Sequence, residues 1–204
     1  MELSAILNTL RSRALEFHRM LCRTHTYTKV ISEIEFLQRT ENYIMQRAAN
    51  IIEDIETMET VLRTLSIGLL YNLSDTVLMV TWDSELGGIH FFKKLSSLFQ
   101  QTPFEFEWRY DEEHGNLVFS IDSVTWSVQC EDLNSVDLYI NPITYSKIDP
   151  IVFDYLEQQG WKLYRPFTGD QTGIILMVPI SAISELRKYL PLNPPDETLT
   201  HRLQ

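Results

Sequence analysis

The fold is decided by the stretch from Thr28 to Leu70, which reads TKVISEIEFLQRTENYIMQRAANIIEDIETMETVLRTLSIGLL. Its apolar residues follow one another at alternating steps of three and four, and neither Pro nor Gly occurs before Gly68. This spacing is typical of a helix that packs lengthwise against another helix. The seam consists of Ile34, Leu37, Ile44, Ala48, Ile51, Ile55, Met58, Leu62, Leu65 and Leu69, with Glu41 as a polar member.

A shorter amphipathic helix is predicted before this stretch, over residues 2–22, and a Thr-rich turn over residues 23–28 follows it. At about 1.5 Å per residue, the first helix would be about 30 Å long and the second about 60 Å. We therefore expect a long α-helical hairpin or coiled coil over residues 1–72. Its first helix would cover only half of the seam on the second.

The distal part of the seam then needs another partner, because an exposed strip of Ile and Leu of that length would be insoluble. Either it packs within the chain, or it meets a helix of a second copy or of a different protein. We assign partner binding to five residues, which we call the distal seam. They are Ile51, Ile55, Met58, Leu62 and Leu65.

From Ser74 onward the apolar period changes from 3.5 to 2, which indicates strands. Strands are predicted at 76–82, 104–110, 117–121, 124–130, 136–140, 161–167 and 174–178, and helices at 89–100, 150–159 and 181–190. This predicts an α+β fold, with a two-layer α/β domain over residues 73–190 and a mainly antiparallel sheet. The order of elements also suggests a duplicated β-α-β-β unit. Residues 191–204 contain three prolines and are predicted to be a flexible tail.

Alternating polar residues define one open face of the predicted sheet. This face has two interpretations, a solvated surface or a recognition surface for a partner. The candidate recognition residues are Glu105, Glu107, Arg109, Tyr139 and Tyr164.

The net charge of −11 is unevenly distributed. Residues 1–30 carry five basic and two acidic side chains, whereas residues 31–65 carry three basic and seven acidic ones. We expect the basic first helix to lie against the acidic second helix. The acidic remainder argues against nucleic-acid binding there.

The location of the protein is predicted to be cytoplasmic, without a membrane partner. No apolar run reaches the roughly 20 residues that span a bilayer, and charged residues interrupt any signal-peptide core near the N-terminus. The two cysteines, Cys22 and Cys130, are expected to be reduced.

Three groups of residues have the composition of chemical sites, and each has a simpler explanation. His18, Cys22 and His25 have the spacing of metal ligands but no evident fourth ligand. The acidic run from Asp111 to His114 falls on a predicted hairpin tip, which is wet. Gly87-Gly88 precedes a helix without the remainder of a phosphate-binding loop. We predict no catalytic residues, no metal and no cofactor.

The paired strand-helix-strand modules resemble the vicinal-oxygen-chelate, glyoxalase-like fold. That resemblance implies a metal held by His and Glu side chains from the sheet, whereas the inward strand positions here are Phe, Trp, Val, Leu and Ile. Our leading hypothesis is a non-enzymatic interaction or assembly protein that binds a protein partner or forms a homo-oligomer through its helical region. One alternative is an acidic inhibitor or immunity-type protein that blocks a basic site. Another is a small-molecule-binding or glyoxalase-like enzyme.

Overall fold

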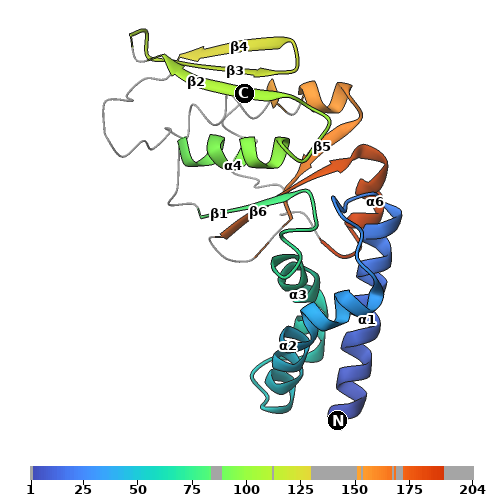
Figure 1. The fold of residues 1–204 in the computed structure, drawn as a ribbon. Coiled ribbons are helices and arrows are strands. Elements are labelled where there is room, and N and C mark those ends of the chain that lie inside the picture. Colours follow the sequence, from blue (N-terminus) through green and yellow to red (C-terminus); the bar gives the residue numbers. More distant parts are fainter. Residues whose placement is uncertain are drawn as a thin grey trace, which may run out of the picture. The chain divides into compact units, whose positions relative to one another are not determined.

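The computed structural model describes residues 2–83, 89–111, 113–129, 151–152, 154–166, 168 and 172–190. These residues form an α+β fold, which confirms the predicted class (Figure 1). The helices are α1 (Leu3–Arg23), α2 (Glu33–Ile52), α3 (Met58–Tyr71), α4 (Ile89–Phe99) and α6 (Ile183–Leu186), with helical residues also at 151–152 and 154–158. The strands are β1 (Met79–Asp83), β2 (Phe106–Asp111), β3 (Asn116–Ile121), β4 (Val124–Gln129), β5 (Trp161–Tyr164) and β6 (Thr172–Pro179).

The chain divides into two compact units. Among the described residues, the first unit contains 2–77, 164–166, 168 and 181–190, and we call it the helical unit. The second contains the described residues between 78 and 163 together with 172–180, and we call it the sheet unit. Whether residues 1–72 and 73–190 fold as separate domains stays a prediction. The predicted strand at 136–140 and tail at 191–204 lie outside the described residues, as do Gly87, Gly88 and Cys130, so the duplication also stays a prediction.

The predicted second helix is not continuous, because α2 ends at Ile52 and α3 begins at Met58. The prediction of one uninterrupted helix is therefore wrong. The N–H of Ile55 donates to the carbonyl of Asn50 at 2.9 Å, and the N–H of Asp54 donates to that of Ile51 at 3.4 Å. This pair of bonds is a Schellman motif, which ends a helix with one residue in the left-handed conformation. Asp54 takes that position, with φ of 56°.

Side-chain caps and a second Schellman motif set the other helix ends of the bundle. Thr57 accepts a hydrogen bond from the N–H of Thr60 at 3.2 Å and so starts α3 immediately after the turn. At the end of α1, the N–H of Thr26 donates to the carbonyl of Leu21 at 3.2 Å, and His25 has φ of 54°. These local contacts make residues 53–57 a tight turn that reverses the chain direction, and they end α1 at Arg23.

The reversal folds α3 back beside the other two helices, so that α1 contacts both α2 and α3, and α2 contacts α3 (Figure 1). Much of the seam that was expected to lack cover in the chain is consequently internal. Val61, Leu65 and Leu69 have no solvent exposure. The buried residues of α2 are Phe36, Thr40, Ile44, Ala48 and Ile51. They differ from the predicted seam at its start, where Ile34 is 71% exposed.

Ion pairs join the basic face of α1 to the acidic side of α2, as the charge distribution predicted. Arg11 pairs with Glu41, so the polar member of the predicted seam contacts α1 at the side of the buried face. Arg19 pairs with Glu33 at 2.7 Å. Both pairs are largely solvated, so water and salt screen them. They orient the two helices more than they stabilise them.

The strands form two three-stranded sheets, where the sequence suggested one mainly antiparallel sheet. Their strand orders are β1-β6-β5 and β2-β3-β4. Strand β1 pairs antiparallel with β6, with Met79 opposite Leu176. In the second sheet, β3 pairs antiparallel with both β2 and β4. A shared apolar core includes Phe92, Leu95 and Phe99 of α4 together with residues of both sheets.

We predict that Asp54→Gly stabilises the protein by about 0.5–1 kcal/mol, because glycine adopts positive φ without the steric penalty of a side chain. The substitution also removes a negative charge from the C-terminal end of α2, where the helix dipole disfavours it. Urea unfolding followed by circular dichroism measures the change. As the control, Gln46→Gly in the exposed interior of α2 should destabilise by about 1 kcal/mol. Equal effects of the two substitutions would contradict the left-handed cap.

The second stability prediction concerns the close approach of α2 and α3 at Gly68. A Cβ atom at Gly68 would lie 2.0 Å from the Tyr43 hydroxyl oxygen and 2.1 Å from Cζ of the same ring. Gly68→Ala should therefore destabilise the protein by about 1–3 kcal/mol, despite the better helix propensity of alanine. In a Tyr43→Ala background the same change should be neutral or stabilising. A double-mutant cycle in urea tests this, and additive effects would refute the steric contact.

Candidate protein-binding surface at the α2–α3 turn

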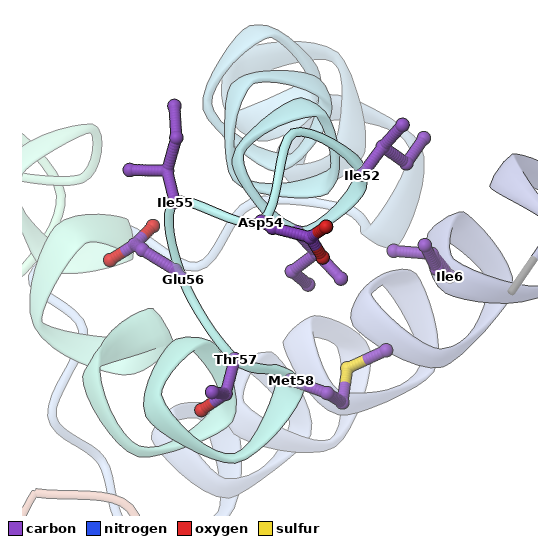
Figure 2. Close-up of a pocket in the computed structure, with 8 residues that line it drawn as sticks. Ile6, Ile52, Asp54, Ile55, Glu56, Thr57 and Met58 are labelled. Carbon is purple, nitrogen blue, oxygen red and sulfur yellow. The ribbon is translucent and has the colours of Figure 1, made fainter.

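The turn between α2 and α3 lies beside the start of α1 and encloses a cavity of about 690 Å³. We call it the tip cavity. Its lining residues are Ile6, Ile51, Ile52, Asp54, Ile55, Glu56, Thr57 and Met58. All of them belong to the helical unit, and Figure 2 shows Ile6 of α1 and Met58 of α3 approaching from two helices. The volume is in the range of ligand-binding clefts, about 300–1,000 Å³.

The rim of the tip cavity exposes large apolar side chains. Ile55 is 66% exposed and Ile52 is 48% exposed, whereas Ile6 is 1% exposed. Ile52 and Ile55 lie on either side of Asp54, and Ile55 projects away from Ile6 (Figure 2). In a Schellman motif the residue at the position of Ile55 often packs on the last turn of the helix. Ile55 keeps most of its apolar surface in solvent instead, so helix capping alone does not use it.

Polar contacts from both helices hold the turn. Glu56 pairs with Arg47 of α2 at 2.8 Å and accepts a hydrogen bond from the Asn50 amide at 2.8 Å. Arg47 also donates to the Thr64 hydroxyl of α3 at 2.7 Å. The Arg47 and Glu56 side chains are only 16% and 20% exposed, so solvent screens this pair less than the surface pairs. The turn therefore presents Ile55 from a supported backbone.

The distal seam is divided between the interior and the surface. Leu65 is buried inside the bundle, whereas Ile51 is 9% exposed and lines the tip cavity. Ile55 and Met58 line the tip cavity. Leu62 lines a separate hollow of about 490 Å³ beside polar residues of α1. Partner binding by these residues stays a prediction.

The candidate recognition face of the sheet does not assemble as predicted. Glu105, Glu107 and Arg109 are exposed along the start and length of β2, in agreement with the alternation. Tyr164 belongs to the other sheet and is 1% exposed, so placing it on a wet face was wrong. Its hydroxyl donates to the carbonyl of Leu190, and burial raises its pKa. Tyr139 lies outside the described residues.

His18 and Cys22 lie together on α1, but His25 does not join them as a third ligand. His18 is 2% exposed, stacks on Phe36 and shares a hydrogen bond of 2.6 Å between its Nδ1 and the Tyr27 hydroxyl. His25 is exposed in the left-handed cap of α1. Within the described parts of the chain, no group of three or more His, Cys, Asp or Glu side chains is arranged to hold a metal ion. The His18 cluster is thus part of the packing between α1, α2 and the connecting segment.

The acidic hairpin tip between β2 and β3 forms a local hydrogen-bonded turn. The Asp111 carboxylate lies 3.0 Å from Nδ1 of His114 and also accepts a hydrogen bond from the His114 backbone N–H at 3.3 Å. The side-chain hydrogen bond with His114 lowers the pKa of Asp111. Because His114 and Glu113 are exposed, this turn lacks the partly dry setting that acid–base catalysis needs.

Of the residues that line the tip cavity, the sequence named Ile51, Ile55 and Met58, but it did not indicate Ile6, Ile52 and Asp54. The available signal was the pair Ile51-Ile52, because neighbouring helix residues cannot both face one seam. None of the described helices has the length and apolar character needed to cross a bilayer.

Burial lowers the pKa of His18 below its ordinary value of 6.5. The unfolded chain therefore binds a proton at His18 at a higher pH than the folded protein does. We predict that the free energy of unfolding is at its full value well above pH 6.5 and falls as the pH decreases through 6.5 toward the lowered pKa of folded His18. Urea unfolding by circular dichroism measures this slope, which His18→Gln should reduce. The neighbouring Glu33 titrates below that window, because its hydrogen bond with Arg19 lowers its pKa. An unchanged slope in His18→Gln would refute the assignment.

No family model, no curated protein and no solved structure matches this chain.

Proposed function

We propose that the chain is a non-enzymatic interaction protein whose helical unit binds another protein at the tip cavity. The observation that carries this proposal is the exposure of Ile52 and Ile55 on the rim of a cavity that Ile6, Ile51 and Met58 also line. Exposed apolar residues are common when they are scattered singly, but two beside a preformed cavity are typical of a binding surface.

The energetic argument for a partner comes from Ile55. Its side chain leaves 66% of its surface in water although it follows a helix end where apolar contact is usual. Fully covering an Ile side chain contributes about 1.5–3 kcal/mol. A partner that covers Ile55 and Ile52 together gains a substantial part of the binding energy without reorganising the turn.

The alternative of an acidic inhibitor uses the same surface. Residues 53–59 contain four acidic side chains and no basic one, so a basic target site would be attracted to this region. An inhibitor and an assembly protein would use the same contact and would differ only in the effect on the partner. The first experiment therefore asks whether the contact exists.

We predict that Ile55→Asp weakens the complex with the natural partner at least roughly tenfold, because a carboxylate replaces an apolar contact. Tagged protein is expressed in its native cell, purified at matched expression and measured as an intact complex by native mass spectrometry. Wild-type protein should carry a partner of defined mass, and Ile55→Asp should lose it. Ile34→Asp is the matched control, because Ile34 is 71% exposed on α2 and does not line the tip cavity.

Two results would contradict the proposal. One is recovery of the same partner, in the same yield, with Ile55→Asp. The other is a wild-type protein that is purified alone under conditions that preserve weak complexes. Circular dichroism of both variants verifies that the helices are retained, since Ile55 lies outside α2 and α3 and Ile34 lies in the first turn of α2, where Asp is favourable.

A further inference from the structure

We infer that the occupant of the tip cavity is a cationic amphipathic segment of a different protein. Its large apolar side chains would cover Ile52 and Ile55, and its Lys or Arg side chains would lie against the acidic rim. This inference rests on the proposed function and names the chemistry of the partner. Three features of the helical unit carry it: exposed isoleucines at the cavity, carboxylates without ion-pair partners beside them, and a basic face of α1 that is already paired within the chain.

The carboxylates near the tip cavity differ from those along the rest of the bundle. Among the described residues, Glu53, Asp54 and Glu59 are exposed and take part in no ion pair, whereas Glu56 is paired with Arg47. Elsewhere among the described residues of the helical unit, the acidic side chains other than Glu2 have arginine partners: Glu16, Glu33, Glu35, Glu41, Asp75 and Glu185. Negative charge is therefore left without a counterpart mainly beside the exposed isoleucines.

The basic face of α1 does not supply the matching surface in a second copy of this chain. The basic residues of α1 are engaged within their own unit: Arg11 with Glu41, Arg19 with Glu33 and Arg23 with Glu185. Arg13 also donates to the carbonyl of Lys188 and lies over the Tyr189 ring at 4.2 Å. Two acidic tips would repel each other, so contact between identical tips is disfavoured.

The shape of the opening favours a segment with clustered apolar side chains. The cavity of about 690 Å³ lies between the start of α1 and the α2–α3 turn, with Ile6 and Met58 on its inner side. An amphipathic helix places anchors at positions i, i+3, i+4 and i+7 and its charges around them. Such a segment brings apolar and basic groups to the surface at once. A highly charged segment without apolar anchors would leave Ile52 and Ile55 exposed.

The test uses a fluorescent peptide of about 18 residues with Leu at helical anchor spacing and Lys elsewhere. Three comparison peptides isolate the features: the same Leu pattern with Glu, the same composition scrambled, and a Lys-rich peptide without Leu. Full-length protein is titrated against each peptide by fluorescence anisotropy at about 0.05 M and about 0.5 M salt. The protein variants are Ile55→Ser, its matched control Ile34→Ser, and the doubly neutralised Glu53→Gln plus Asp54→Asn.

We expect the amphipathic Lys peptide to bind most tightly. Ile55→Ser should weaken that binding at least roughly tenfold, while Ile34→Ser should leave it within about twofold. The doubly neutralised variant should weaken binding and flatten its salt dependence, because fewer charges then attract the peptide. Circular dichroism of each variant verifies that a loss of binding is not a loss of fold.

Several outcomes would overturn the inference. These are equal binding of the Glu peptide, equal binding of the scrambled or Leu-free peptide, or insensitivity of the Lys peptide to Ile55→Ser. Sedimentation velocity that shows self-association abolished by Ile55→Ser would identify a second copy as the occupant instead. If native complexes depend on Ile55 but no cationic peptide binds, the partner chemistry is wrong and the proposed function stands. If native complexes do not depend on Ile55, the proposed function fails first.

Discussion

The helical unit depends on the reversal of the chain at residues 53–57. Two backbone hydrogen bonds from Asp54 and Ile55 end α2, and Thr57 begins α3 directly afterwards. If helix had continued from residue 53 to residue 71, it would have extended roughly 30 Å farther and carried its apolar side chains away from α1. The reversal instead places Leu65 and Leu69 in the interior. It converts most of an exposed stripe into a core and leaves Ile55 outside it.

Close packing between α2 and α3 holds the turn and so fixes the position of the exposed side chains of Ile52 and Ile55. The Tyr43 ring fills the space beside Gly68, and the guanidinium of Arg47 lies 5.9 Å from the centre of the same ring. Arg47 also connects Glu56 of the turn with Thr64 of α3. Because both helices hold the turn through these contacts, little ordering remains to be done when a partner binds. Preorganisation of this kind improves affinity by lowering the entropy lost on association.

The parts of the fold that the sequence predicted are those encoded by local periodicity. The 3.6-residue pattern identified α1 and α4, and the strict alternation along β2 and β3 placed Phe119 inside and Glu107 outside. The end of α2 was missed because a left-handed cap without glycine leaves no compositional signal. The sequence alone also did not show that Met79 pairs with Leu176, since that choice depends on contacts between distant segments. A periodic pattern specifies which face of an element is apolar, but it does not specify which element covers that face.

The residues of the tip cavity also fall into those that the sequence predicted and those that it did not. Ile55 and Met58 were predicted because they continue the heptad, while Ile6 and Ile52 enter the surface only after the chain has reversed. Tyr164 was misplaced for the converse reason, because its alternation with neighbouring residues does not reveal that its hydroxyl reaches the Leu190 carbonyl. Residues on two helices can form one surface only when a turn brings them together. The turn is therefore both the main error of the sequence-based fold and the origin of the candidate site.

At the tip cavity, charged side chains would govern which partner binds, and apolar side chains would govern how tightly it binds. Along α1 and α2 the arginines are used within the chain, as in the pairs of Arg11 with Glu41 and Arg19 with Glu33, and these exposed pairs add little stability. They do, however, neutralise the bundle side and leave the acidic character concentrated at Glu53 and Asp54. Unpaired charge at a rim changes the encounter rate and rejects partners of the same sign, whereas the apolar contact supplies most of the binding energy. In the proposed complex, an acidic rim around isoleucine would select against other acidic proteins and nucleic acid, while Ile55 would determine how long a basic partner stays bound.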